Sequence, residues 1–155
     1  MGFSVSASTA IVFIAAFVSV GIMYTAAFNG YERVEDATSV EMESSLARQN
    51  TAIDVTNVTH DTSGTTDYVN VSVLNEGSTA LSVTDTDVLL NGTYVDTFAS
   101  RTVTTDGGTI EAGPNGTDLW LPNETLTVSI HRNVSEPIHV SVVTENGVTA
   151  TEVTP

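Results

Sequence analysis

The feature that most constrains this chain is a stretch of 19 residues, from Ala10 to Phe28, without a charged side chain. As an α-helix, such a stretch is about 28 Å long, close to the thickness of the hydrocarbon layer of a bilayer. Nine of its residues are Ile, Val or Phe, and each favours insertion by about 0.3 to 0.6 kcal/mol. The sequence therefore predicts a membrane-spanning helix in segment 1–30, with anchor positions at Ala10, Ile14, Phe17, Gly21 and Phe28.

An apolar N-terminal segment has three interpretations: a cleaved signal peptide, the assembly helix of a pilin-like subunit, or a permanent anchor. Signal peptides and pilin leaders carry a positively charged region before the apolar core, and the opening "MGFSVSAST" has no Lys or Arg. The early Glu of many pilin helices is also missing. A signal-peptide cut after Ala27, which follows small residues, stays open as an alternative. We expect a permanent anchor.

The charged residues all follow Tyr31 and are strongly one-sided. The chain has 19 acidic residues, four arginines and no lysine, which gives a net charge of -15. At about 1 M salt the Debye length is only about 3 Å, so such a surface repels itself little there. The composition predicts a halophilic protein and argues against nucleic acid as a partner, since phosphate binding needs a basic face. Cysteine is absent, which excludes disulfides and thiolate metal sites.

Six Asn-X-Ser/Thr acceptor triplets follow the apolar segment. Ten Asn and 40 Ser or Thr among 155 residues would give fewer than three by chance. The excess favours glycosylation outside the cell, although a Thr-rich β-domain also produces such triplets. We expect the N-terminus inside and the C-terminal domain outside the cell membrane. The candidate acceptors are Asn57, Asn70, Asn91, Asn115, Asn123 and Asn133.

Residues 31–51 form the predicted stalk. Tyr31, Val34, Thr38 and Met42 recur at helical spacing, with acidic residues on the other faces. This narrow stripe indicates a helix that continues from the membrane segment, with Asn50 as its end. A solvated stalk and a partner-helix surface are both compatible with it.

Residues 52–155 change to a period of two with many β-branched side chains, which is typical of strands. The runs expected to be strands are "AIDVTNV", "YVNVSVL", "TDVLL", "TYVDTF", "RTVT", "ETLTVSI", "IHVSVVT" and "VTATEV". Asn91-Gly92 and Asn146-Gly147 each carry the signal of a two-residue hairpin turn. Seven or eight short antiparallel strands predict an immunoglobulin-like β-sandwich outside the membrane, which makes the chain mainly β. Its predicted core comprises Val71, Val73, Leu81, Val88, Leu90, Leu126, Val128, Ile130, Val140 and Val142.

Few residues suggest chemistry. The three histidines, at 60, 131 and 139, lack metal-ligand spacing and are expected to be exposed at strand ends. Asp85 and Asp87 share one face of a strand, where they form either a solvated acidic face or a contact for Ca²⁺. Trp120 is expected at the edge of the core, with an exposed partner contact as the alternative. We expect no catalytic residue, no metal site and no cofactor.

The quoted segments also carry a resemblance to a known family. The opening "MGFSVSASTAIVFIAAF", its continuation to "NGYERVEDA", and the later "VSVLNEGSTALSVTDTDVLLNG" resemble the archaellar accessory proteins called FlaF (ArlF), especially the haloarchaeal ones. The first 40 residues carry most of the likeness. The sister protein FlaG and other pilin-like archaeal chains share the same plan.

The resemblance implies a stator role at the base of the archaellum, in which the β-sandwich binds the surface-layer protein in the pseudoperiplasm. It also implies archaellum partners such as FlaG and a homodimer through the β-domain. From the residues alone, either "AIDVTNV" or "VTATEV" is an edge strand that a second copy or a lattice protein could pair with. The alternatives are a pilin-like or FlaG-like filament subunit and a membrane-tethered ion- or solute-binding domain.

Overall fold

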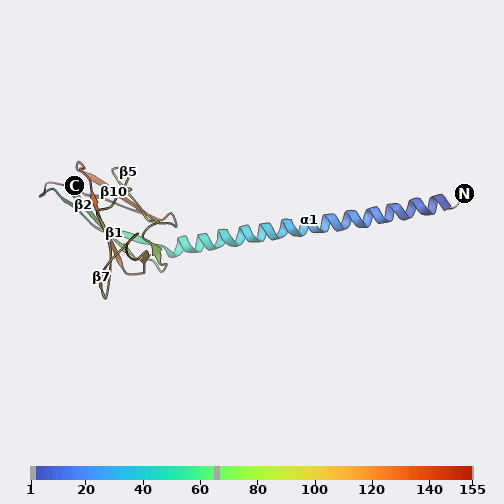
Figure 1. Ribbon diagram of the computed structural model, residues 1–155, viewed down its shortest axis with the longest axis horizontal. Helices are drawn as coiled ribbons and strands as arrows, with labels where there is room; N and C mark the ends of the chain where they lie inside the picture. The colour runs from blue at the N-terminus through green and yellow to red at the C-terminus, as the bar shows by residue number, and fades with distance from the viewer. Residues whose placement is uncertain (1–2, 65–66, 155) are drawn as a thin grey trace. The chain divides into compact units, whose positions relative to one another are not determined.

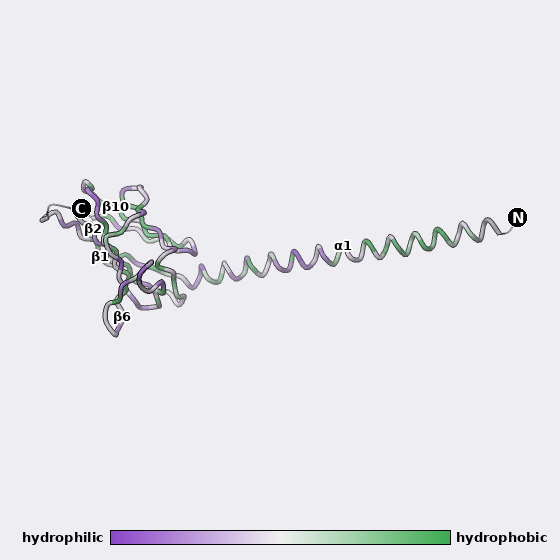
Figure 2. The backbone as a smooth tube through the Cα atoms, viewed as in Figure 1, coloured by the Kyte–Doolittle hydropathy of each residue, from purple (hydrophilic) through white to green (hydrophobic). Residues whose placement is uncertain are grey.

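The computed structural model describes residues 3–64 and 67–154, and the chain forms two compact units, residues 1–43 and 44–155. Helix α1 (Phe3–Asn50) is one helix of 48 residues (Figure 1). Its apolar residues occupy the N-terminal part and hydrophilic residues follow toward its C-terminal end (Figure 2). The helix ends at Asn50, as predicted, while the anchor and stalk boundaries at residues 30 and 51 stay predictions.

The β-domain is an antiparallel sandwich, which confirms the predicted fold class. One sheet has five strands in the order β1 (Ile53–Asp61), β2 (Tyr68–Asn75), β9 (Thr125–His131), β6 (Ser100–Thr105) and β7 (Gly108–Glu111). The other sheet has four strands in the order β11 (Thr149–Thr154), β10 (Ile138–Val143), β4 (Asp87–Leu90) and β5 (Thr93–Tyr94). A two-stranded ladder joins β3 (Leu81–Ser82) to β8 (Leu119–Trp120).

The core lies between the two sheets, because alternate side chains of each strand point inward. Buried and half-buried positions alternate without exception from Val69 to Asn75 in β2 and from Thr125 to Ile130 in β9. All ten residues predicted for the core are buried. The structure adds Val55, Val69, Val83, Val95, Val103, Trp120 and Ile138 to them.

One of the two predicted hairpin turns is confirmed. Asn91 and Gly92 have φ angles of 50° and 74° and connect the paired residues Leu90 and Thr93, as in a two-residue type I′ turn. The second prediction is wrong. Thr144 N–H donates to Val148 O at 3.0 Å, and Gly147, at φ 73°, donates to Thr144 O. Three residues therefore form this loop, the arrangement in which a turn is followed by a glycine bulge.

Two further strand predictions differ from the structure. The run "TYVDTF" is a strand only at Thr93–Tyr94, because the chain then leaves the four-stranded sheet and crosses to β6 in the other. Strands β3, β7 and β8 were not predicted. Two of them have only two residues, which is too short for a period-two pattern to be recognised.

The predicted edge strands 52–58 and 148–153 correspond to β1 and β11, and both are edges of their sheets. The two strands lie side by side, one from each sheet. Strand β1 has a bulge between Val55 and Asn57, an irregularity that is common at edges and interrupts pairing. The other two edges are β7 and β5.

Candidate functional site

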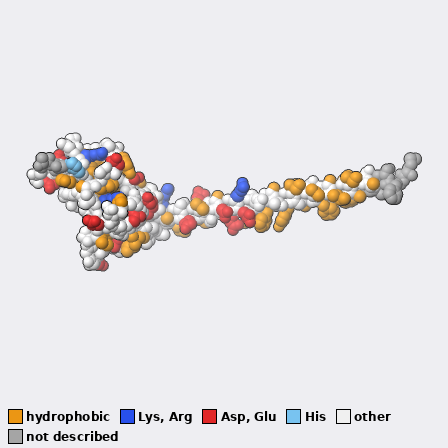
Figure 3. Space-filling model, in the orientation of Figure 1, with side chains coloured by type: hydrophobic (Ala, Val, Ile, Leu, Met, Phe, Trp, Pro, Cys, Tyr) orange, Lys and Arg blue, Asp and Glu red, His pale blue; other side chains and the backbone are white. Residues whose placement is uncertain are grey.

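The anchor segment of α1 presents a fully exposed apolar surface. The predicted anchor residues Ala10, Ile14, Phe17, Gly21 and Phe28 are all exposed, and Figure 3 shows hydrophobic side chains along this part of the helix. Ser19 and Thr25 donate their hydroxyl hydrogens to the carbonyls of Ala15 and Gly21, at 2.8 and 3.0 Å, so they add no unpaired polar group. The segment is long and apolar enough to cross a membrane.

The C-terminal turn of α1 is attached to the β-domain by the loop between β10 and β11. Arg48 Nε donates to the Asn146 carbonyl at 2.9 Å, and Asn146 Nδ2 donates to Thr51 Oγ1 at 2.9 Å. Thr51 is buried, and its hydroxyl donates to the Ala47 carbonyl at 2.8 Å. One loop therefore binds the helix end through both a side chain and a backbone carbonyl.

A second loop, residues 75–78, binds the same helix end through backbone groups. Ser78 N–H donates to Asn50 O at 2.9 Å, and Gly77 N–H donates to Ala52 O at 3.0 Å. The bond from Ser78 satisfies a carbonyl that an α-helix leaves free at its C-terminus, and the bond from Gly77 holds the chain just after the helix. A Cβ atom at Gly77 would lie 2.5 Å from Asn50 O, so only glycine fits here. We call the two loops and residues 47–52 the junction.

The junction rests on a buried polar residue. Asn75 has no exposed surface; its Nδ2 donates to the carbonyls of Thr79 and Trp120 at 2.9 and 3.2 Å, and its Oδ1 accepts from Gly77 N–H at 3.1 Å. A buried amide with its bonds made fixes the surrounding backbone. The second loop is thereby linked to the sandwich core.

Trp120 is fully buried and belongs to the core. Its indole N–H donates to Glu124 O at 2.8 Å, which satisfies the polar atom that a buried Trp carries. The suggested partner contact through its ring is therefore not available in this structure. The exposed apolar surface here belongs to the flanking Leu119 and Leu121, at 51% and 41%.

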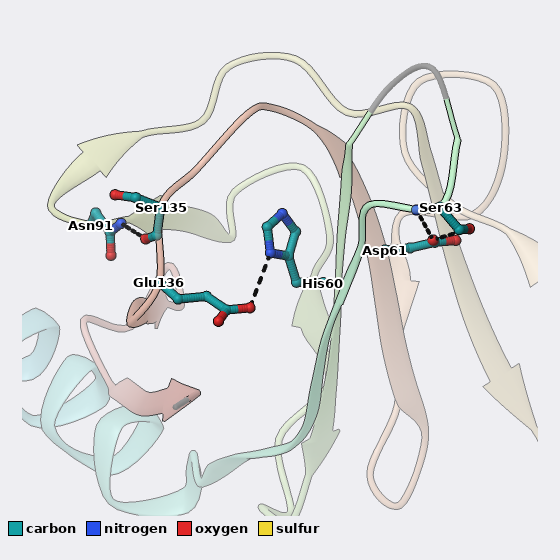
Figure 4. Close-up of polar contacts among 6 residues, drawn as sticks. All are labelled: His60, Asp61, Ser63, Asn91, Ser135 and Glu136. Carbon is teal, nitrogen blue, oxygen red and sulfur yellow. Dashed lines mark hydrogen bonds and ion pairs between the residues drawn. The ribbon is translucent and has the colours of Figure 1, made fainter.

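Opposite the junction, a polar contact between His60 and Glu136 connects the two sides of the sandwich (Figure 4). His60 Nδ1 lies 3.5 Å from Glu136 Oε1, and the His60 side chain is only 9% exposed. His60 was predicted to be exposed, and this is wrong: it pairs with the buried Val69 in β2 and so faces inward, since directly opposite residues point to the same face of a sheet. Its Nε2 is buried without a hydrogen-bond partner among the described residues.

The other two histidines are exposed, as predicted. The His131 ring lies 5.4 Å from the Tyr68 ring, centroid to centroid. The backbone N–H of His139 donates to Asn91 Oδ1 at 2.7 Å, and Asn91 Nδ2 donates to Ser135 O at 3.3 Å. The described part of the chain contains no group of three His, Cys, Asp or Glu side chains that could hold a metal ion.

The candidate glycosylation residues differ in accessibility. Five are exposed and Asn70 is half-buried in β2, between two neighbouring strands. Asn91 is exposed, but its amide already bonds the backbone on both sides as described. Four others are exposed, and their side-chain amides make no such bond to a described residue: Asn57, Asn115, Asn123 and Asn133.

The acidic pair Asp85 and Asp87 is exposed near the start of β4. Asp87 lies close enough to Tyr94 that its negative charge raises the pKa of the phenol above its ordinary value of 10.0. Another carboxylate has a structural role: Asp118 Oδ1 accepts from the N–H and the hydroxyl of Thr84, both at 2.7 Å. These bonds lower the pKa of Asp118 below its ordinary value of 3.8.

Sequence reasoning missed the residues of the junction. Asn146-Gly147 was identified as a turn signal, whereas the Asn and Gly of segment 75–77 were not; a turn signal also does not say which residues the turn contacts. Arg48, one of four cations in an acidic chain, was the signal available, because a lone Arg in the last turn of a helix has carbonyls within reach.

The chain was compared with known proteins. It matches the family model of archaeal-type flagellin over residues 2–153, and no curated protein sequence matches it. Among solved structures it is similar to the archaellum periplasmic stator protein FlaG from Sulfolobus acidocaldarius, with a TM-score of 0.46 and 19% identity over 67% of this chain and 99% of that one. It is also similar to the complex of FlaF and FlaG from the same organism, with a TM-score of 0.45 and 17% identity over 66% of this chain and 87% of that one.

These two structural likenesses are too distant to carry an argument about function. The family match is different, because it extends over almost the whole chain, helix and sandwich together. The chain is therefore archaellum-associated, and it belongs to the archaeal-type flagellin family.

Proposed function

We propose that this protein is a non-enzymatic accessory protein of the archaellum, of the stator type, which holds the motor by binding the surface-layer protein. The observation that carries the proposal is the junction. Hydrogen bonds from two loops of the sandwich bind the last turn of α1, so the helix does not end in a flexible linker. A stator has to transmit force between the membrane and a fixed structure, and a bonded junction meets this requirement better than a flexible coil does.

In this proposal α1 spans the cell membrane once and the sandwich lies outside it, at the base of the archaellum. The six acceptor triplets, all on the β-domain, support this topology, because such residues are modified on the outer side. The partners are the surface-layer protein, archaellum components such as FlaG, and a second copy through the β-domain. The acidic surface of a halophile requires high salt for such contacts, since salt screens the repulsion between acidic proteins.

Binding to the surface layer tests the proposal directly. The full-length protein, reconstituted in lipid nanodiscs, should bind purified surface-layer protein in molar salt and lose this binding in dilute buffer. Empty nanodiscs are the control. No binding in molar salt would refute the surface-layer role.

Force transmission has a separate test in the cell. Thr38→Pro should interrupt α1, because proline removes an amide hydrogen and clashes with the carbonyl one turn earlier, at a cost of about 3 kcal/mol or more. The Thr38 hydroxyl already bonds the Val34 carbonyl at 2.8 Å, so Thr38→Ala is the matched control. Swimming should be impaired by proline only, with membrane insertion kept in both. Normal swimming of the proline variant would contradict a force-transmitting helix.

A second candidate function is a filament subunit, and the family match over residues 2–153 favours it. A subunit of this kind would be processed by a leader peptidase before assembly. Mass spectrometry of the protein isolated from its own membrane decides between the two. An intact Met1 or Gly2 supports the permanent anchor, and a truncated N-terminus with the protein found in filaments supports the subunit.

A further inference from the structure

The β-domain has a groove of about 460 Å³ whose lining includes an arginine. It is lined by residues 96–102 before and within β6 and by the loop after β7; the lining includes Asp96, Phe98, Arg101, Glu111 and Asn115. We propose that this groove receives the carboxylate of an acidic side chain from an extended segment of a partner protein, with the Arg101 guanidinium as the binding group. The inference goes beyond the proposed stator role, because it does not depend on which protein supplies the segment.

Arg101 is held in place for such a contact. Its guanidinium carbon lies 4.8 Å above the centre of the Phe98 ring, and its Nη1 donates to Val83 O at 3.3 Å. On another side it packs against Gly113, where a Cβ atom would come within 2.8 Å of the guanidinium carbon. A guanidinium fixed in this way loses little conformational freedom when it binds a ligand.

The hydrogen-bonding capacity of Arg101 is mostly unused. A guanidinium has five N–H donors, and within residues 3–64 and 67–154 that of Arg101 makes one hydrogen bond, to Val83 O. Among the described residues, no carboxylate oxygen lies within 4.0 Å of its nitrogens. Asp118 is near enough for the Arg101 charge to contribute to its lowered pKa, but it accepts its hydrogen bonds from Thr84 and Ser82. The two parallel N–H bonds that a guanidinium can donate to a carboxylate are therefore left for a ligand.

The acidic residues of the groove restrict what can enter. Asp96 and Glu111 also line it, and their negative charges repel a polyanion more strongly than a single carboxylate that contacts Arg101 directly. At about 1 M salt the screening length of about 3 Å suppresses this repulsion while the direct contact persists. The groove therefore fits one acidic side chain better than a phosphate or an acidic cluster.

The neighbouring edge strand indicates that the ligand is an extended segment. All residues of β7 are exposed, and the strand pairs with β6 on one side only. Because Ala112 N–H donates to Arg101 O, the backbone groups of Thr109 point away from β6 and are open to an added strand. Ile110, 51% exposed, pairs with the buried Val103 and so lies on the same face of the sheet as Arg101. A strand added here would carry alternate side chains toward the groove.

Fluorescence anisotropy with the full-length protein in detergent and molar salt tests this. The probe is a labelled peptide of valine and threonine with one central glutamate and a blocked C-terminus, compared with its glutamine counterpart. The glutamate peptide should bind at least about tenfold more tightly. A third peptide, with glutamine and a free C-terminal carboxylate, tests whether the carboxylate that binds Arg101 comes from a side chain or from a chain end. If it binds as tightly as the glutamate peptide, the assignment to a side chain is overturned.

Two variants locate the effect. Arg101→Gln should remove the difference between the glutamate and glutamine peptides, while Arg132→Gln, at the other half-buried arginine, should keep it. Equal affinity of the two peptides for the unaltered protein would overturn the proposal, whatever the stability of the variants. It would mean that Arg101 only fixes its own loop. Loss of the preference in Arg132→Gln as well would also overturn it, because general charge would then be responsible.

Discussion

The two ends of the sandwich are held in different ways. At the junction, two loops bind the end of α1 mainly through backbone carbonyls and amides, and glycine is required at position 77. At the opposite end, the His60 ring and the Glu136 carboxylate lie 3.5 Å apart and link the two sides of the sandwich. The junction therefore depends on close packing and on several backbone hydrogen bonds, whereas the other end has a single long contact between two side chains.

The largest expected effect follows from filling the space at the junction. Gly77→Ala places a methyl group 2.5 Å from the Asn50 carbonyl, and relieving such overpacking costs about 1 to 3 kcal/mol. Thermal unfolding should show a decrease of roughly 4 to 8 °C for each kcal/mol in a domain of this size.

Gly107→Ala is the matched control for that change. The nearest atom to a Cβ atom there is 3.6 Å away and φ is not in the left-handed region, so its stability should change by less than about 0.5 kcal/mol. Equal effects of the two substitutions would show that the close approach at Gly77 does not matter.

A smaller effect is expected from removing one bond of the junction. Asn146→Ala deletes the amide that donates to Thr51 Oγ1, and a lost hydrogen bond costs about 0.5 to 1.5 kcal/mol. Hydrogen exchange should accelerate at the Thr51 and Ser78 amides, which bond the last turn of α1. Unchanged exchange at these two amides would show that Asn146 does not contribute to the attachment of the helix. Asn115→Ala, in an exposed loop, is the control.

The opposite end should respond less. His60→Leu removes the contact with Glu136 together with the unpaired buried Nε2, and replacing a polar group that lacks a partner is often close to neutral. We expect a change in the free energy of unfolding within about 1 kcal/mol. Glu136→Gln leaves the histidine in place and shows what the charge contributes. A loss of stability as large as that of Gly77→Ala would contradict the expectation that this end responds less than the junction.

Acid should weaken the β-domain through carboxylates outside the junction. Hydrogen bonds from Ser63 lower the pKa of Asp61, and those from Thr84 lower the pKa of Asp118, both below 3.8. A depressed folded-state pKa stabilises the protein above the unfolded value, and this stability is lost as the pH falls through the folded value. Asp118→Asn should flatten the decline measured below pH 3.8. If the free energy of unfolding of this variant falls with acid as in the unaltered protein, Asp118 does not contribute to the acid sensitivity. Asp106→Asn, in the turn before β7, is the control.

The sequence was sufficient for the parts of the fold that rest on periodicity. Val71, Val73, Val128 and Ile130 alternate with polar residues, and such alternation in β-branched residues identifies strands and their buried faces directly. It was not sufficient where tertiary contacts decide. Strand β8 is two residues long and exists because Trp120 pairs with Leu81, 39 positions earlier in the chain.

The same limit applies to the candidate site. The apolar segment could be predicted because its length and composition are read directly from the sequence, while its role as an anchor stays a prediction. The junction could not, because it joins Arg48 to Asn146 across 98 positions. His60 was predicted to be exposed because a single histidine in a polar run carries no signal of burial. The β1 bulge after Val55 decides which of its side chains face inward, and a bulge of this kind cannot be identified from alternation alone.

That bulge also matters for what happens when many copies share one membrane. An anchor confines the domains to a surface, where neighbours meet far more often than in free solution, and a flat edge strand would then be a template for growing fibres. The interruption between Val55 and Asn57 denies a neighbouring copy a continuous ladder along β1. Under the proposed membrane anchoring, the bulge would therefore limit pairing between neighbouring copies along β1.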